Sequence, residues 1–110
     1  MSINFKDVFN NLKRDIAILA KRTFEDNVKE AKKDGQQILD LLKTQLAAYT
    51  EEMAAGALTK KEFNDLVLGE KAELEMVALK RAGITLVEAD KFKESVLNLI
   101  INTISGLVGV

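Results

Sequence analysis

The chain contains no cysteine, histidine, proline or tryptophan, and its only aromatic residues are five phenylalanines and one tyrosine. Without cysteine there is neither a disulfide framework nor a thiolate nucleophile. Without histidine the commonest general base and the commonest metal ligand are missing, together with every catalytic triad built on imidazole. The composition therefore predicts a protein without catalytic activity, and it indicates no cofactor, metal ion or small-molecule substrate.

Charge does not single out a partner for this chain. Sixteen basic and 17 acidic residues give a net charge of −1, so no long-range field attracts the protein to nucleic acid. Neither a P-loop nor a G-x-G-x-x-G stretch occurs, so nucleotide binding has no support. Residues 1–16 mix charged with apolar residues, unlike a signal peptide, and the predicted location is cytoplasmic.

The first half of the chain predicts one long helix. Proline is absent, and Asn4 can cap a helix that begins at Phe5. Apolar residues then recur with a mean step of about 3.7 residues as far as Met53. We expect a helix over residues 5–55, bent at most at Gly35, where a glycine on the apolar stripe would let another helix cross closely. If Gly35 breaks this helix, the chain has four helices and not three.

Capping signals mark two further helices. Thr59 and Glu62 form the T-x-x-E capping box, in which each side chain accepts a hydrogen bond from the other residue's backbone amide. A similar pattern begins at Thr85, directly after a glycine suited to end the preceding helix. The predicted helices span residues 60–82 and 86–108.

Together these elements predict an all-α fold, namely an elongated antiparallel helical bundle of three helices completed by oligomerisation, in a single domain over residues 1–110. The helix over 60–82 has two opposite apolar faces, so either it is covered from both sides or the apolar residues of the second face are tolerated at the surface. One face holds Phe63, Leu66, Val67, Leu74, Val77 and Ala78, and the other holds Leu68, Ala72, Met76 and Leu79. Glu70 and Arg81 fall on the first face, either at its edge or facing a partner on another helix or chain.

The C-terminal segment is the most informative part of the sequence, because no charged residue follows Glu94. From Leu86 onward its apolar residues cover an arc of roughly 200° on an amphipathic helix. Three explanations compete: the helix is the central element of a monomer, it is shared between chains, or it binds a lipid surface. A central position needs helices on two sides, and a continuous first helix leaves little chain for the second side.

We therefore predict a non-enzymatic helical assembly or interaction protein that self-associates, as a dimer or a higher oligomer, through its C-terminal helix. Burial of the large apolar residues between Val96 and Val108 supplies on the order of 12 kcal/mol before ordering costs. The predicted interface consists of Val96, Leu97, Leu99, Ile100, Ile101, Ile104, Leu107, Val108, Leu68 and Met76.

The alternative function is a lipid- or membrane-associating amphipathic protein that uses residues 95–110. Basic residues also gather on one side of the first predicted helix, and interspersed acidic residues favour a solvated face over binding to nucleic acid or anionic lipid. These basic residues are Arg14, Lys21, Arg22, Lys29, Lys32 and Lys33.

Overall fold

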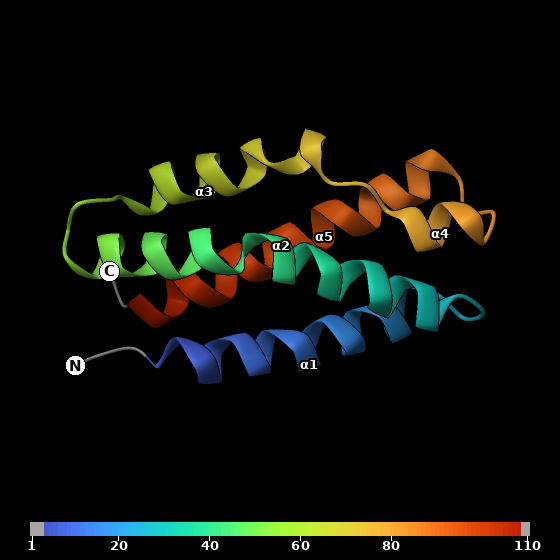
Figure 1. Ribbon diagram of the computed structural model, residues 1–110, viewed down its shortest axis with the longest axis horizontal. Coiled ribbons are helices and arrows are strands. Elements are labelled where there is room, and N and C mark those ends of the chain that lie inside the picture. Colours follow the sequence, from blue (N-terminus) through green and yellow to red (C-terminus); the bar gives the residue numbers. More distant parts are fainter. Residues whose placement is uncertain (1–3, 109–110) are drawn as a thin grey trace.

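The computed structural model describes residues 4–108, and all regular structure in this range is helical (Figure 1). The molecule is elongated, with extents of 43 × 24 × 19 Å. The all-α and elongated predictions are therefore confirmed. The elements are α1 (Phe5–Thr23), α2 (Val28–Ala54), α3 (Lys60–Gly69), the 3-10 turn η1 (Lys71–Glu73), α4 (Val77–Arg81) and α5 (Leu86–Val108).

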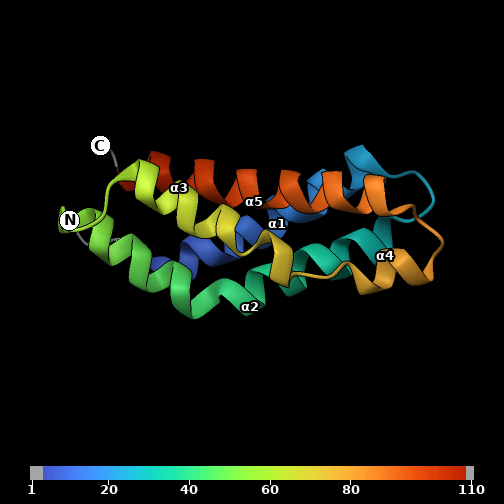
Figure 2. The same cartoon turned by 90° about the horizontal axis from the view of Figure 1, so that it is seen from above.

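The long helices run side by side in alternating directions along the long axis (Figure 1). Helices α2 and α5 contact each other in the middle of the molecule. Helix α1 lies on one side of this pair, and α3 and α4 lie on the other, as the two views together show (Figures 1 and 2). Helix α5 therefore contacts every other helix of its own chain.

The prediction of a single helix over residues 5–55 is wrong, and the break does not fall at Gly35. Helix α1 ends at Thr23, Phe24 is extended, and α2 begins at Val28, so the chain turns back over residues 24–27. The Thr23 hydroxyl donates to the carbonyl of Leu19, which offers the helix end an alternative hydrogen bond. The apolar stripe passes through this turn without interruption because both helices face the same core.

Gly35 has the other role expected of it, which is close packing. A Cβ added at Gly35 would lie 2.5 Å from Cγ2 of Ile16 and 3.5 Å from Cζ of Phe92. Helix α2 therefore passes very close to α1 at this position, and it continues through the glycine as far as Ala54. The expected close crossing is confirmed.

The prediction of a continuous helix over 60–82 is also wrong. Helix α3 ends at Gly69, the 3-10 turn follows, Leu74 is extended, and α4 begins only at Val77. This irregular segment changes the direction in which the later side chains point. As a result, residues from both predicted apolar faces reach one core: Phe63 and Val67 from the first face and Met76 and Leu79 from the second are all buried.

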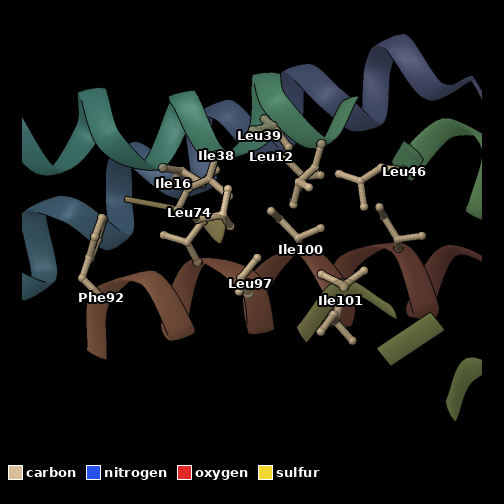
Figure 3. Close-up of a cluster of buried hydrophobic side chains, with 14 of the residues drawn as sticks. Leu12, Ile16, Ile38, Leu39, Leu46, Leu74, Phe92, Leu97, Ile100 and Ile101 are labelled. Atoms are coloured by element: carbon tan, nitrogen blue, oxygen red, sulfur yellow. The ribbon is translucent and has the colours of Figure 1, made fainter. Parts of the chain in front are cut away.

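Helix α5 has the predicted bounds and supplies the centre of the core (Figure 3). Val96, Ile100 and Ile104 are fully buried by residues of the same chain. The premise that this helix cannot be covered by its own chain is therefore wrong. The physical reason is the turn at 24–27, because it divides the first half of the chain into two helices and so supplies the second flank.

Candidate functional site

The ten residues predicted to form an interface have different positions in the structure. The buried ones have no surface to offer a second copy in this conformation, and only Leu107, which is 51% exposed, lies largely in solvent. Val96, Leu97, Ile100, Ile101, Ile104 and Met76 are buried, whereas Leu68, Leu99 and Val108 are partly buried. The C-terminal helix therefore offers its outer side, and not its apolar arc, to other molecules.

A groove of about 460 Å³ lies between α1 and α5 on this outer side. Its centre is apolar, because Ile18 is 44% exposed there and Leu19 and Leu99 are partly buried beside it. Leu99 is the one predicted interface residue that lines this groove. We name it the α1–α5 groove, and its lining residues are Asp15, Ile18, Leu19, Arg22, Ser95, Asn98, Leu99 and Asn102.

The α5 side of the groove is polar but carries no charge. Ser95, Asn98 and Asn102 are exposed and follow one another at helical spacing, so they share one face. Because no charged residue follows Glu94, this face stays uncharged for the rest of the described helix. Hydroxyl and amide groups can both donate and accept hydrogen bonds. Such a face can be covered by another helix without burying a charge.

The α1 side of the groove carries opposite charges near its two ends. Asp15 and Arg22 are seven residues apart, which is about two helical turns, so they lie on the same side of α1. Neither forms an ion pair among the described residues. Both side chains are therefore free to pair with a group outside this chain.

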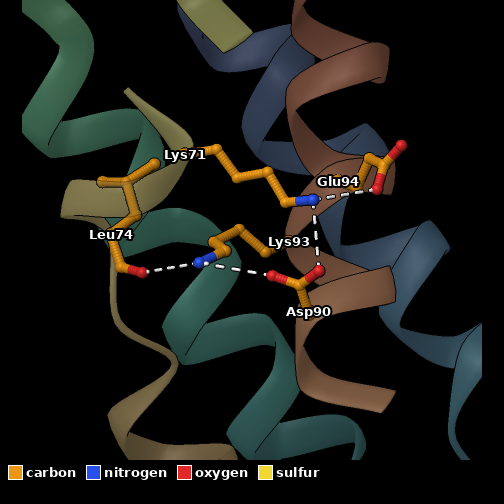
Figure 4. Close-up of polar contacts among 5 residues, drawn as sticks. All are labelled: Lys71, Leu74, Asp90, Lys93 and Glu94. Atoms are coloured by element: carbon orange, nitrogen blue, oxygen red, sulfur yellow. Dashed lines mark hydrogen bonds and ion pairs between the residues drawn. The ribbon is translucent and has the colours of Figure 1, made fainter. Parts of the chain in front are cut away.

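The clearest ion-pair network lies elsewhere, between η1 and α5 (Figure 4). The Lys71 ammonium is 3.1 Å from Asp90 and 3.1 Å from Glu94. Lys93 donates to the carbonyl of Leu74 at 2.9 Å and is 3.6 Å from Asp90. These contacts connect the irregular segment after α3 to α5, which is a structural role.

The pKa values within this network shift as the pairing requires. The hydrogen bond from Lys71 holds the pKa of the Asp90 carboxyl below its usual value. The hydrogen bond to Glu94, followed by the one to Asp90, raises the pKa of Lys71. Both groups are therefore held in their charged forms over a wider pH range, which suits ion pairing and not proton transfer.

Sequence reasoning missed Asp34, a buried acidic residue of α2. Its carboxylate accepts hydrogen bonds from the backbone amides of Ala78 at 3.0 Å and Leu79 at 2.8 Å, and it thereby connects α2 to α4. The available signal was position, because Asp34 falls on the apolar stripe between Ala31 and Ile38. A carboxylate at such a position needs a buried hydrogen-bonding partner.

Residues 4–108 lack two further kinds of feature, a metal-binding cluster and a membrane-spanning helix. No group of three or more acidic residues in this range is arranged to hold a metal ion. No helix in the same range combines the length and apolar character required to cross a membrane.

Comparison with known proteins gives no matching family model, no matching curated protein and no matching solved structure. The α1–α5 groove, which Leu99 lines, is a part of the predicted interface region that the structure leaves open to a partner.

Proposed function

We propose that this chain is a non-enzymatic protein that self-associates as a twofold dimer through the α1–α5 groove. Each copy is an antiparallel helical bundle with its own complete core, and association joins two such bundles by their outer sides. The observation that supports this proposal is the self-complementary lining of the groove. An exposed apolar centre lies beside an uncharged helix face and between two opposite charges.

Twofold symmetry turns this lining into a set of matched contacts. In a twofold interface the same patch is used by both copies, so residue i meets residue j and j meets i. If two α1 helices pack antiparallel about Ile18, Asp15 of each copy faces Arg22 of the other. The interface then contains two equivalent ion pairs, with the apolar side chains at its centre.

The expected affinity is modest, because the exposed apolar area in the groove is small and the ion pairs lie at its rim. Exposed ion pairs contribute roughly 0.2–1 kcal/mol each, and interfaces of limited area are typically transient. We therefore expect a dissociation constant on the order of 10–100 μM. Most of the protein is monomeric below this range and dimeric well above it.

Charge reversal at Asp15 and Arg22 tests the proposal directly. Asp15→Arg places two pairs of arginines face to face, and Arg22→Asp places two pairs of aspartates face to face. Each variant alone should dimerise at least about tenfold more weakly than the original protein, since attraction becomes repulsion at both pairs. An equimolar mixture of the two variants restores both ion pairs and should form a heterodimer.

Sedimentation equilibrium from about 10 μM to about 1 mM measures the monomer–dimer equilibrium of each variant, because dimer formation doubles the mass of 12.2 kDa. Asp40→Arg is the matched control, since Asp40 is an exposed acid on α2 outside the groove. A protein that stays monomeric over the whole range would overturn the proposal. The groove would also be the wrong surface if both variants dimerised as strongly as the control. A substitution in the apolar arc of α5, such as Ile100→Asp, does not test the groove, because Ile100 is fully buried within one chain and a charge there would disturb folding.

Lipid association is the second candidate function, and one observation favours it. Leu86 and Val87 are adjacent at the start of α5 and are 69% and 65% exposed. Two adjacent apolar side chains at one end of an elongated molecule could enter a lipid surface. Co-sedimentation with vesicles should then be lost in the double variant Leu86→Ser, Val87→Ser. Protein that stays in the supernatant with anionic and neutral vesicles alike would exclude this function.

A further inference from the structure

A second cleft, of about 610 Å³, lies between α2 and α4 and is separate from the α1–α5 groove. Three basic residues line it: Lys29 and Lys33 from α2, and Arg81 from the last turn of α4. All three are exposed to solvent. Val77, which is 37% exposed, adds an apolar surface to the same cleft.

The basic groups outnumber the acidic groups that are free to neutralise them. Asp34 also lines the cleft, but it is buried, and both of its carboxylate oxygens accept hydrogen bonds from the backbone amides of α4. Glu30 is the other acidic residue in the lining. None of the three basic residues forms an ion pair within residues 4–108.

Arg81 is the residue that connects this cleft to the sequence pattern. The sequence places Arg81 on an apolar face of the helix predicted over 60–82, but that helix is interrupted after Gly69, and Arg81 is exposed in the last turn of α4. The structure places it in the same cleft as Lys29 and Lys33, which carry the same charge. Like charges that share a cleft repel one another, and an anion bound between them relieves that repulsion.

We propose that the cleft between α2 and α4 binds a phosphate group. A phosphate monoester carries a charge of about −1.5 to −2 at neutral pH and three strong acceptor oxygens, which suits three basic side chains better than a single carboxylate does. Arginine can donate two parallel hydrogen bonds to phosphate, and lysines act as point charges. The volume of the cleft is in the range of small-molecule sites, and Val77 can contact an organic part of the ligand.

Inorganic pyrophosphate is the soluble probe, titrated by calorimetry at low ionic strength. Arg81→Gln and Lys29→Gln should each weaken binding about tenfold, since each removes one charged partner of the phosphate. Glu30→Gln should strengthen binding because it removes the neighbouring negative charge. Lys32→Gln is the matched control: Lys32 is an exposed lysine on the same helix but does not line the cleft. Circular dichroism of each variant verifies that the fold is intact.

A second arm identifies the source of the phosphate. Vesicles of phosphatidylcholine with and without phosphatidic acid are sedimented with the same set of variants. Binding to phosphatidic acid that is lost in Arg81→Gln and kept in Lys32→Gln identifies a lipid headgroup, whereas binding of pyrophosphate alone identifies a soluble ligand. The proposal is overturned if neither probe binds, or if Lys32→Gln weakens binding as much as Arg81→Gln does.

Discussion

Replacing Asp34 with alanine should release α4 from α2. Helix α4 has only five residues, and its own N-cap residue, Met76, makes no side-chain capping hydrogen bond. A helix this short is not stable in isolation. The amides of Ala78 and Leu79 belong to its first turn, where a helix has no acceptors of its own. Asp34 supplies both acceptors from another helix, at 3.0 and 2.8 Å.

The size of the effect follows from the burial of the two amides. Leu79 is fully buried, so in Asp34→Ala its N–H loses its acceptor at a cost of about 1–3 kcal/mol. Ala78 is only partly buried, so water can replace part of its lost hydrogen bond. Relief of the cost of burying a carboxylate offsets some of the total. We expect a loss of about 2–3 kcal/mol, and about half of that for Asp34→Asn, which keeps one acceptor oxygen.

Urea unfolding measures the loss in the global free energy of unfolding. In thermal unfolding, a loss of this size corresponds to a fall in Tm of roughly 10 °C. Hydrogen exchange measures the local effect, because the Leu79 amide should lose protection while the amides of α1 keep theirs relative to global unfolding. Asp40→Ala is the control, an exposed acid on the same helix that should change stability by less than about 0.5 kcal/mol. If Asp34→Ala unfolds like this control and Leu79 stays protected, the carboxylate does not hold α4 in place.

Three other predictions concern packing, capping and pH. Gly35→Ala should destabilise the folded protein by about 1–3 kcal/mol, because the new Cβ overlaps Ile16. Gly106→Ala places its Cβ in open space and should stabilise the protein by up to about 1 kcal/mol. Equal effects of the two substitutions in thermal unfolding would contradict this prediction. Thr59→Ala should cost about 1 kcal/mol in denaturant unfolding because it removes the observed capping box; an unchanged midpoint would show that the box contributes nothing. Pairing with Lys71 lowers the pKa of Asp90 in the folded protein. The contribution of this ion pair to folding stability is therefore present above the usual carboxyl pKa and is lost as the pH falls through the lowered pKa. Stability measured from pH 7 to pH 2 should therefore fall less steeply in Lys71→Gln, and an identical slope would refute the linkage.

Local signals in the sequence were sufficient wherever the determining contacts lie within a few residues. The capping box at Thr59 forms as predicted, with both reciprocal hydrogen bonds. The hydroxyl of Thr85 accepts from the amide of Glu88, and α5 begins directly after it. The preceding Gly83 has the positive φ expected of a residue that ends a helix. Each of these features depends on residues no more than four apart in the chain.

The same local signals did not predict the outward-facing surface of α5 as the candidate site. The apolar arc of α5 was recognised, but its burial depends on which helices cover it. That covering requires α1 and α2 to lie on different sides of the core, and so depends on the turn at 24–27. The groove beside Leu99 is formed jointly by α1 and the uncharged face of α5, two segments that are far apart in the sequence.

The sequence by itself determined the helical content, the caps and which residues of α5 are apolar, because helix periodicity and capping are properties of neighbouring residues. The tertiary structure decided where the long helices break. The spacing of the apolar residues is not interrupted at a turn when the helices before and after it face the same core, so this spacing does not mark the break. It also decided the hydrogen-bonding partners of Asp34 and the basic residues that share a cleft with Arg81, which come from segments more than 40 residues away. A contact between such distant segments leaves no periodic signal, because it depends on the path of the whole chain.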